Sequence, residues 1–234
     1  MEIARFDDYE GMSLHAAALI RKDLAQKPDL SICLATGNSP AGTYAALVKM
    51  SASDPTLFER IKVVKLDEWG GLPMDAPETC EQYILSKFLR PLGIPGARLL
   101  GFASDPADAE AECARVQAKL DELAPLDLCV LGLGKNGHLG FNEPAPFLQA
   151  GCHVASLSKA SMQHAMVDSA DRKPRFGFTL GMRDILTCRR IILLVSGKGK
   201  EDATARLLSG KISTSTPATF LWLHPKVHCL INSG

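Results

Sequence analysis

Five short apolar runs recur along the chain, and none of them alternates strictly between apolar and polar positions. Each is five or six residues long and rich in Val, Ile and Leu, which is typical of β-strands that are covered on both faces. A less apolar strand is expected at Arg98–Phe102. The five runs are Leu30–Ala35, Ile61–Leu66, Leu126–Leu131, Arg190–Val195 and Val227–Ile231.

Helical patterns separate these runs. The clearest is expected to begin at Ser104 or Asp105 as N-cap, with Pro106 in the first helical position. Its apolar positions then follow the three- and four-residue spacing of one helix face, at Cys113, Val116, Leu120 and Leu123.

Strands that alternate with helices predict βαβ units and right-handed crossovers. We therefore expect an α/β fold with a doubly wound, mostly parallel sheet and helices on both faces. Neither an internal repeat nor a Pro/Gly/Ser-rich linker is visible, so residues 1–234 are expected to form a single domain.

Charge and composition exclude several classes of function. The 26 basic residues balance the 26 acidic ones, and no Lys/Arg run offers a footprint for nucleic acid or an anionic membrane. No signal peptide or membrane-spanning stretch is evident. The seven cysteines are scattered and never form CxxC, which favours a reduced compartment. We expect a cytoplasmic protein that binds neither nucleic acid nor membrane.

Ligands of open parallel sheets bind outside the carboxyl ends of the strands, so the segments that follow the strands are the candidates for chemistry. Four of them combine glycine with polar or charged residues: ATGNSPAGTY (35–44), DEWGGLP (67–73), GKNGHLGFNEP (134–144) and SGKGK (196–200).

Two of these segments are candidates for binding phosphate. In the first, backbone N–H groups at a helix N-terminus can approach an anion. An ordinary tight turn without a bound phosphate is an equally good interpretation of this segment. Its candidate residues are Thr36, Gly37, Asn38, Ser39 and Thr43. In the fourth, Lys198 and Lys200 could bind phosphate as point charges, whereas a solvated turn is the simpler interpretation.

Asp67 follows a buried strand and could act as a general base on a ligand, although an N-cap is the commoner use of such a residue. Glu68 and Trp69 beside it favour a functional role only modestly.

Residues 132–137 spell GxGxxG, but His138 to Pro144 cannot continue as the helix that a dinucleotide site requires. His138 and Glu143 suggest instead an imidazole held by a carboxylate. The histidines have no metal-ligand spacing and GxSxG is absent, so we expect no metal, no cofactor and no serine triad.

Taken together, the segments resemble the glucosamine-6-phosphate deaminase family, which shares its fold with the 6-phosphogluconolactonases. The matching pieces are LATGNSPAGTY, KLDEWGGLP, LGLGKNGHLGFNEP and LLVSGKGK, and the GHxxFNEP pattern is specific to the deaminases. Segments such as TCEQYI and TPATFLWLHP are most similar to the galactosamine-6-phosphate isomerase/deaminase subgroup.

The resemblance implies roles for particular residues. Asp67 would move a proton between C2 and C1, and His138, oriented by Glu143, would open the pyranose ring. The first glycine-rich loop and Lys200 would hold the 6-phosphate, and the substrate-binding set would also include Glu68 and Gly137.

This chain departs from the family at three places. Asn136 replaces the Asp of some members, and its amide is expected to hydrogen-bond the imidazole. The phosphate-binding arginine has no counterpart after Ser161–Met166, where Arg172 or Arg175 could substitute. APFLQAGCHVASL replaces the basic allosteric stretch, so we expect a monomer or small homo-oligomer without activation by N-acetylated sugar phosphates.

The expected activity is therefore ring opening, isomerisation and deamination of a 2-amino-2-deoxyhexose 6-phosphate. Subgroup resemblance favours galactosamine 6-phosphate, and glucosamine 6-phosphate stays open because the two sugars differ only at C4. The alternatives are 6-phosphogluconolactonase activity and a sugar-phosphate-sensing module. The sensing module is expected to carry a helix-turn-helix segment and eroded catalytic positions.

Overall fold

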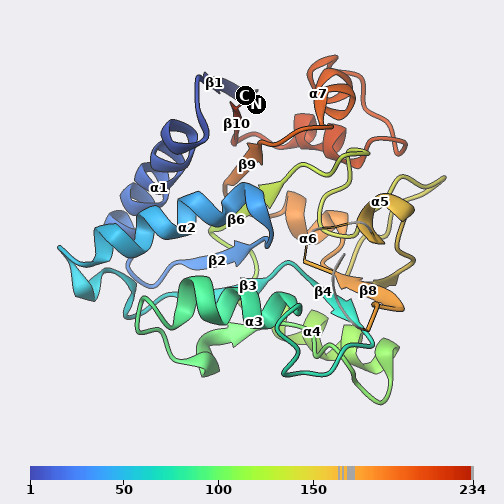
Figure 1. Ribbon diagram of the computed structural model, residues 1–234, viewed down its shortest axis with the longest axis horizontal. Helices are drawn as coiled ribbons and strands as arrows, with labels where there is room; N and C mark the ends of the chain where they lie inside the picture. Colours follow the sequence, from blue (N-terminus) through green and yellow to red (C-terminus); the bar gives the residue numbers. More distant parts are fainter. Residues whose placement is uncertain (163, 165, 168–171, 233–234) are drawn as a thin grey trace.

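The computed structural model describes residues 1–162, 164, 166–167 and 172–232 (Figure 1). Its strands are β1 Glu2–Phe6, β2 Ser31–Leu34, β3 Lys62–Lys65, β4 Asp67–Gly70, β5 Leu99–Leu100, β6 Leu128–Gly132, β7 His153–Ala155, β8 Phe176–Thr179, β9 Ile191–Val195 and β10 Val227–Asn232. Its α-helices are α1 Tyr9–Gln26, α2 Asn38–Ser51, α3 Cys80–Ile84, α4 Ala109–Leu123, α5 Lys159–Met162, α6 Met182–Leu186 and α7 Glu201–Leu208. Short turns of 3₁₀ or π helix are η1 Pro55–Phe58, η2 Leu85–Leu89, η3 Gly96–Arg98 and η4 Pro217–Leu223.

Within the described residues, seven strands form the main sheet in the order β1-β10-β9-β6-β2-β3-β5, and every neighbouring pair is parallel. Each of the five apolar runs overlaps one of these strands, although β6 and β10 each extend one residue beyond the predicted end, and the sixth predicted strand is the two-residue β5. The prediction of a mostly parallel α/β sheet is thereby confirmed.

Alternate residues of the strands face two separate hydrophobic cores. Cys33, Cys129 and Leu193 point to the core formed with α4, α6 and α7, whereas Ile32 and Leu128 point to the core formed with α1 and α2. The helices therefore cover both faces of the sheet, as predicted. Burial on both sides explains why the strands read as continuous apolar runs.

Two strand regions depart from the sequence-based expectations. No strand was expected before Leu30, whereas Glu2–Phe6 forms the edge strand β1 beside β10. Its residues are mostly exposed, so it has no buried apolar signature. Asp67–Gly70 is strand β4 rather than a loop, in a second sheet of order β4-β8-β7 whose pairs are antiparallel.

The start of helix α4 also differs from the prediction. Asp108, not Ser104 or Asp105, is the N-cap, and its carboxylate accepts hydrogen bonds from the backbone N–H groups of Glu110 and Ala111 at 2.9 and 3.0 Å. The Ser104 hydroxyl instead donates to the Leu72 carbonyl at 2.9 Å. The predicted apolar face is correct, with three of its four positions buried and Leu123 partly buried.

The order of strands reverses between β2 and β6. From β2 the chain proceeds to β3 and β5 on one side, and it then returns to β6, β9 and β10 on the other. Such a switch point leaves a crevice at the carboxyl ends of the two central strands. None of the helices that the structure describes is both long and apolar enough to cross a membrane.

Candidate active site

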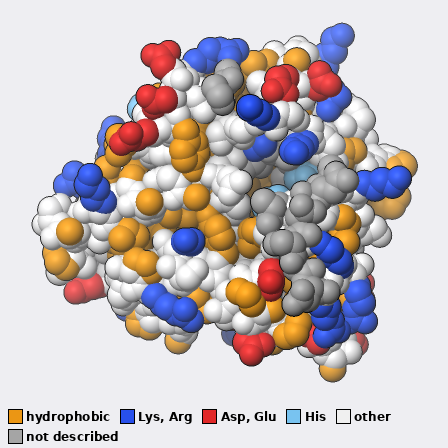
Figure 2. Space-filling view, in the orientation of Figure 1, with side chains coloured by type: hydrophobic (Ala, Val, Ile, Leu, Met, Phe, Trp, Pro, Cys, Tyr) orange, Lys and Arg blue, Asp and Glu red, His pale blue; other side chains and the backbone are white. Residues whose placement is uncertain are grey.

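A cavity of about 420 Å³ lies at the carboxyl ends of β2, β3, β6 and β9. The four segments predicted to carry chemistry all contribute to its wall. Figure 2 shows a hollow on this face of the molecule, with a histidine side chain visible inside and Lys or Arg side chains along one rim. Its polar lining comprises Thr36, Asn38, Ser39, Asp67, Lys135, His138, Ser161, His164, Ser196, Lys198 and Lys200.

Asp67 provides a carboxyl group to the cavity from the first position of β4. It is 9% exposed, and its Oδ1 atom accepts no hydrogen bond from any of the described residues. Burial, assisted by the negative charge of Glu68, raises the pKa of Asp67 to about 7, while His138 and Lys65 oppose the shift. A carboxyl group that titrates near neutral pH can both accept and return a proton.

His138 provides an imidazole to the same cavity. Its Nδ1 atom lies 3.2 Å from Oε2 of Glu143, so a neutral ring donates its Nδ1 proton to the carboxylate and keeps Nε2 basic. Gly134 packs against the ring so closely that a Cβ there would lie 2.3 Å from Cδ2 of His138. The imidazole is therefore fixed in both position and tautomer.

Glu143 is held in its ionised form beneath this imidazole. Although burial opposes it, hydrogen bonds and charge from His138, with further hydrogen bonds from Ser161 and Asn136, lower the pKa of Glu143 to about 2. The Asn136 amide donates to Oε2 of Glu143 at 2.8 Å, and the Ser161 hydroxyl donates to Oε1. Asn136 and Glu143 do not line the cavity and act on it through His138.

The amide of Asn136 corrects one expectation. It contacts Glu143 rather than the imidazole ring, while its Oδ1 accepts from the backbone N–H of His138 at 3.1 Å. Asn136 therefore links the loop backbone to the carboxylate that orients the ring.

Basic side chains gather elsewhere on the cavity wall. The Lys200 ammonium donates to the Ser39 hydroxyl at 3.0 Å, and the Ser196 hydroxyl lies 3.3 Å from the same oxygen. Burial, and next the charge of Lys135, lower the pKa of Lys200 to about 8. Ser39 belongs to the first turn of α2, whose N-terminus adds positive potential. This group of residues can hold an anion.

Several residues predicted to bind the substrate lie outside the cavity lining. Gly37 is the N-cap of α2 with φ of 88°, and Thr43 is fully buried within α2. Gly137, with φ of 90°, accepts a backbone hydrogen bond from Ala218 at 2.9 Å. Glu68 is fully buried, and its carboxylate is bound by Lys65 and by backbone N–H groups. These four residues support the cavity wall without lining the cavity.

Neither predicted substitute for the phosphate-binding arginine lines the cavity. Arg175 is 63% exposed and pairs with Asp105 at 3.5 Å, with its Nε atom close to Gly71. Arg172 is also exposed. Residues 163 and 165 of the segment compared with the family's arginine lie outside the described residues.

His164 is a cavity residue that sequence reasoning missed. Its Nδ1 atom accepts from the backbone N–H of Met166 at 3.3 Å, so the proton of the neutral ring resides on Nε2, which lies against Gly37. Burial, followed by the charges of His138, Lys200 and Lys135, lowers the pKa of His164. A neutral ring in this tautomer presents a hydrogen-bond donor.

Lys135 and Ser161 also went unpredicted. Lys135 lies inside the GxGxxG segment, directly after a strand, and this position could have marked it as a cavity residue. The segment was instead interpreted through its glycines. The sequence around Ser161 and His164 carries no comparable signal, because only the fold brings these residues to Glu143 and Gly37. Among the described residues, no group of three or more His, Cys, Asp or Glu side chains is arranged to hold a metal ion.

Comparison with known proteins gives a consistent picture. The family model described as glucosamine-6-phosphate isomerases/6-phosphogluconolactonase matches residues 9–229. AgaI of Escherichia coli strain K12, a candidate deaminase, is 43% identical over 231 residues, which cover 99% of this chain and 92% of AgaI. Glucosamine-6-phosphate deaminase 1 of Bacillus subtilis strain 168 is 36% identical over 234 residues, covering 99% and 97%.

Solved structures agree with these sequence matches. A monomeric glucosamine-6-phosphate deaminase superposes with a TM-score of 0.93 at 35% identity, covering 100% of this chain and 98% of the other. The 6-phosphogluconolactonase of Thermotoga maritima gives a TM-score of 0.76 at 20% identity over 99% of both chains, which is a likeness of fold. The resemblance inferred from the motifs is confirmed: this chain belongs to the glucosamine-6-phosphate isomerase/6-phosphogluconolactonase family.

Proposed function

We propose that this enzyme opens, isomerises and deaminates a 2-amino-2-deoxyhexose 6-phosphate, consuming water and releasing ammonia and a ketose 6-phosphate. The observation that carries the proposal is one cavity that contains the buried Asp67 carboxyl, the oriented His138 imidazole and a set of basic side chains. The deaminases among the similar proteins support the same activity.

The basic part of the cavity would bind the 6-phosphate. Lys200 and Ser39 are already joined by a hydrogen bond, and Lys135 and Lys198 add positive charge. His164 offers an Nε2–H donor on the same wall. A phosphate held here would orient the reacting carbons without taking part in the chemistry.

His138 would open the pyranose ring. Its basic Nε2 can take the proton of the C1 hydroxyl and return a proton to the ring oxygen, so that the C1–O5 bond breaks and C1 becomes an aldehyde. The ionised Glu143 stabilises the imidazolium that forms in between. Asn136 and Ser161 keep Glu143 in place.

Asp67 would then transfer a proton from C2 to C1. Removal of the C2 proton, acidified by the aldehyde, gives an enolamine, and protonation at C1 leaves an imine at C2. Water adds to the imine carbon and ammonia departs, which yields the C2 ketone. Burial suits Asp67 to this transfer, because it raises the pKa of the carboxyl group to about 7, near neutral pH.

Subgroup resemblance favours galactosamine 6-phosphate, with tagatose 6-phosphate as product. Glucosamine 6-phosphate, giving fructose 6-phosphate, is the second candidate. We further propose a cytoplasmic, metal-independent enzyme that acts as a monomer or small homo-oligomer. Lactonase activity is the less favoured alternative, since lactone hydrolysis requires no base at C2. A sensing module would have no need of the intact group of Asp67, His138 and Glu143.

Ammonia release from each amino sugar phosphate tests the proposed function. We expect ammonia and a ketose 6-phosphate from purified protein without added metal, and a higher kcat/KM for galactosamine 6-phosphate than for glucosamine 6-phosphate. A coupled glutamate dehydrogenase assay measures the ammonia. Hydrolysis of 6-phosphogluconolactone without ammonia release from either sugar would contradict the proposal.

Replacing Asp67 with Asn is expected to lower kcat by roughly 10²–10⁴-fold, the usual contribution of a positioned general base. The fold should persist, because Asn is isosteric and Oδ1 of Asp67 accepts no hydrogen bond among the described residues. Asp105→Asn, at an exposed carboxylate paired with Arg175, is the matched control. A kcat near the wild-type value in Asp67→Asn would remove Asp67 from the mechanism.

The pH profile of kcat/KM should be bell-shaped with its maximum between about 7 and 8. Below the Asp67 pKa of about 7, the carboxyl group is protonated and cannot accept the C2 proton. Above the Lys200 pKa of about 8, the ammonium loses its charge and the phosphate binds less well. Steady-state kinetics between pH 5 and pH 10 measure both limbs, and a profile flat across pH 6–9 is the contrary outcome.

Lys200→Met should mainly raise KM. Loss of one hydrogen bond to a charged group costs about 1.5–3 kcal/mol, which corresponds to roughly 10- to 150-fold in kcat/KM. The variant should also lack the alkaline limb of the pH profile. Lys211→Met, at an exposed lysine, serves as the control. An unchanged KM would place the phosphate elsewhere in the cavity.

A further inference from the structure

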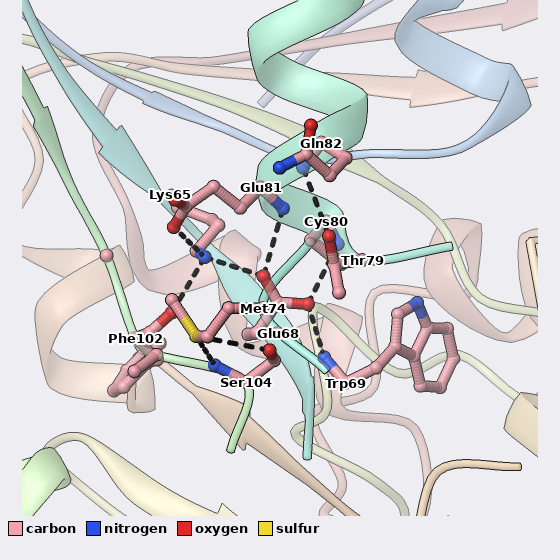
Figure 3. A network of polar contacts seen from close by, with 12 residues as sticks. Lys65, Glu68, Trp69, Met74, Thr79, Cys80, Glu81, Gln82, Phe102 and Ser104 are labelled. Carbon is pink, nitrogen blue, oxygen red and sulfur yellow. Dashed lines mark hydrogen bonds and ion pairs between the residues drawn. The ribbon is translucent and has the colours of Figure 1, made fainter. Parts of the chain in front are cut away.

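Lys65 and Glu68 form an ion pair that is completely removed from solvent, between the end of β3 and the helix α3. The Lys65 ammonium lies 2.6 Å from Oε2 of Glu68, and both side chains are 0% exposed (Figure 3). Lys65 also donates to the Phe102 carbonyl at 2.7 Å and pairs with Glu81 at 3.1 Å. Its three N–H donors are thus all engaged.

The carboxylate of Glu68 is equally well satisfied. Oε1 accepts from the backbone N–H groups of Trp69 and Cys80, both at 2.8 Å, and Oε2 accepts from that of Glu81 at 2.9 Å. Cys80 and Glu81 are the first two residues of α3, so their N–H groups have no partner within the helix and donate to the carboxylate instead (Figure 3). Glu68 therefore ties β4 to two other elements.

A buried ion pair is weak grounds for stability, because desolvation cancels most of the Coulombic gain. The packing around the Lys65–Glu68 pair nevertheless accommodates it. A Cβ at Gly101 would lie 2.5 Å from Cε of Lys65, so the lysine occupies space that only glycine leaves open. The position of the pair suggests a purpose other than stability.

Glu68 follows Asp67 directly in β4, and successive side chains of a strand point to opposite faces. Asp67 faces the cavity, and Glu68 faces the ion pair. We propose that Glu68, clamped by Lys65 and the N-terminal amides of α3, is the positioning residue that fixes Asp67 in the cavity and sets its charge environment. This inference rests on the proposed role of Asp67 as the base.

The charges around Asp67 support this role. Besides burial, its pKa is raised by Glu68 of β4 and lowered by His138 of the β6 loop, by Lys65 of β3 and by the Cys80 thiol of α3. The two members of the ion pair thus act in opposite directions. Removal of either charge leaves the opposite charge uncompensated beside the catalytic carboxyl.

A pair that only held α3 against the sheet would affect stability and nothing else. The positioning role predicts opposite shifts in the acid limb of the kcat/KM profile. Glu68→Gln should move the limb to lower pH and Lys65→Met should move it to higher pH, each by roughly half a unit or more. Both should reduce kcat more than they change KM, and the double variant should return the limb towards the wild-type position.

The exposed pair Lys119–Glu122 is the matched control, because it has the same residue types and the same i,i+3 spacing at 3.0 Å. Lys119→Met and Glu122→Gln should leave the profile unchanged. Circular dichroism shows whether each variant folds. If the buried variants do not fold, Glu81→Gln replaces them, since Glu81 is 30% exposed and pairs with Lys65: its loss leaves the positive charge of Lys65 less compensated near Asp67, which should move the limb to lower pH.

Carboxyl ¹³C NMR, with Asp67→Asn for assignment, follows the titration of Asp67 without substrate. It therefore separates this proposal from the proposed activity: the NMR shifts persist even if no amino sugar releases ammonia. Folded variants in which Asp67 titrates as in the wild type, or in which both single variants shift in the same direction, would overturn the positioning role.

Discussion

The parallel pairing of β2, β6 and β9 is the constraint on which the site depends. Because these strands run in the same direction, the segments that follow them begin at the same edge of the sheet. The reversal of strand order between β2 and β6 opens that edge, and β3 delivers Asp67 to it after a single intervening residue. Residues more than a hundred positions apart, such as Ser39 and Lys200, are hydrogen-bonded as a result.

Burial then gives these side chains their chemical character. The same exclusion of water raises the proton affinity of the Asp67 carboxyl and lowers that of the Lys200 ammonium, so that both titrate near neutral pH. Burial also raises the pKa of Glu143, but hydrogen bonds from several sides and the charge of His138 outweigh it and keep Glu143 ionised. The cavity therefore holds one carboxyl that is ready to exchange protons, and a second carboxyl stays charged behind the imidazole that lines the cavity.

Much of this arrangement could be predicted from the sequence. Strands buried on both faces appear as apolar runs, and GHxxFNEP places His138 next to Glu143 within a short loop. Strand β4 could not be predicted, because DEWG becomes a strand only by pairing with β8 more than a hundred residues later. Likewise, nothing local distinguishes Glu68, whose distant partners lie on β3 and α3, from a ligand-binding acid. Nor does any local pattern mark His164 as a cavity residue.

The central claim is that Asp67 and His138 serve one sugar whose phosphate is held by Lys200 and Ser39. A crystal structure with an open-chain 2-amino-2-deoxyhexitol 6-phosphate tests it most directly, because this analogue keeps the phosphate and the C2 amine but cannot react. The account predicts the phosphate at Lys200 and Ser39, and C1 and C2 within contact distance of the Asp67 carboxyl. A phosphate bound away from Lys200, or a C2 atom out of reach of Asp67, would contradict it.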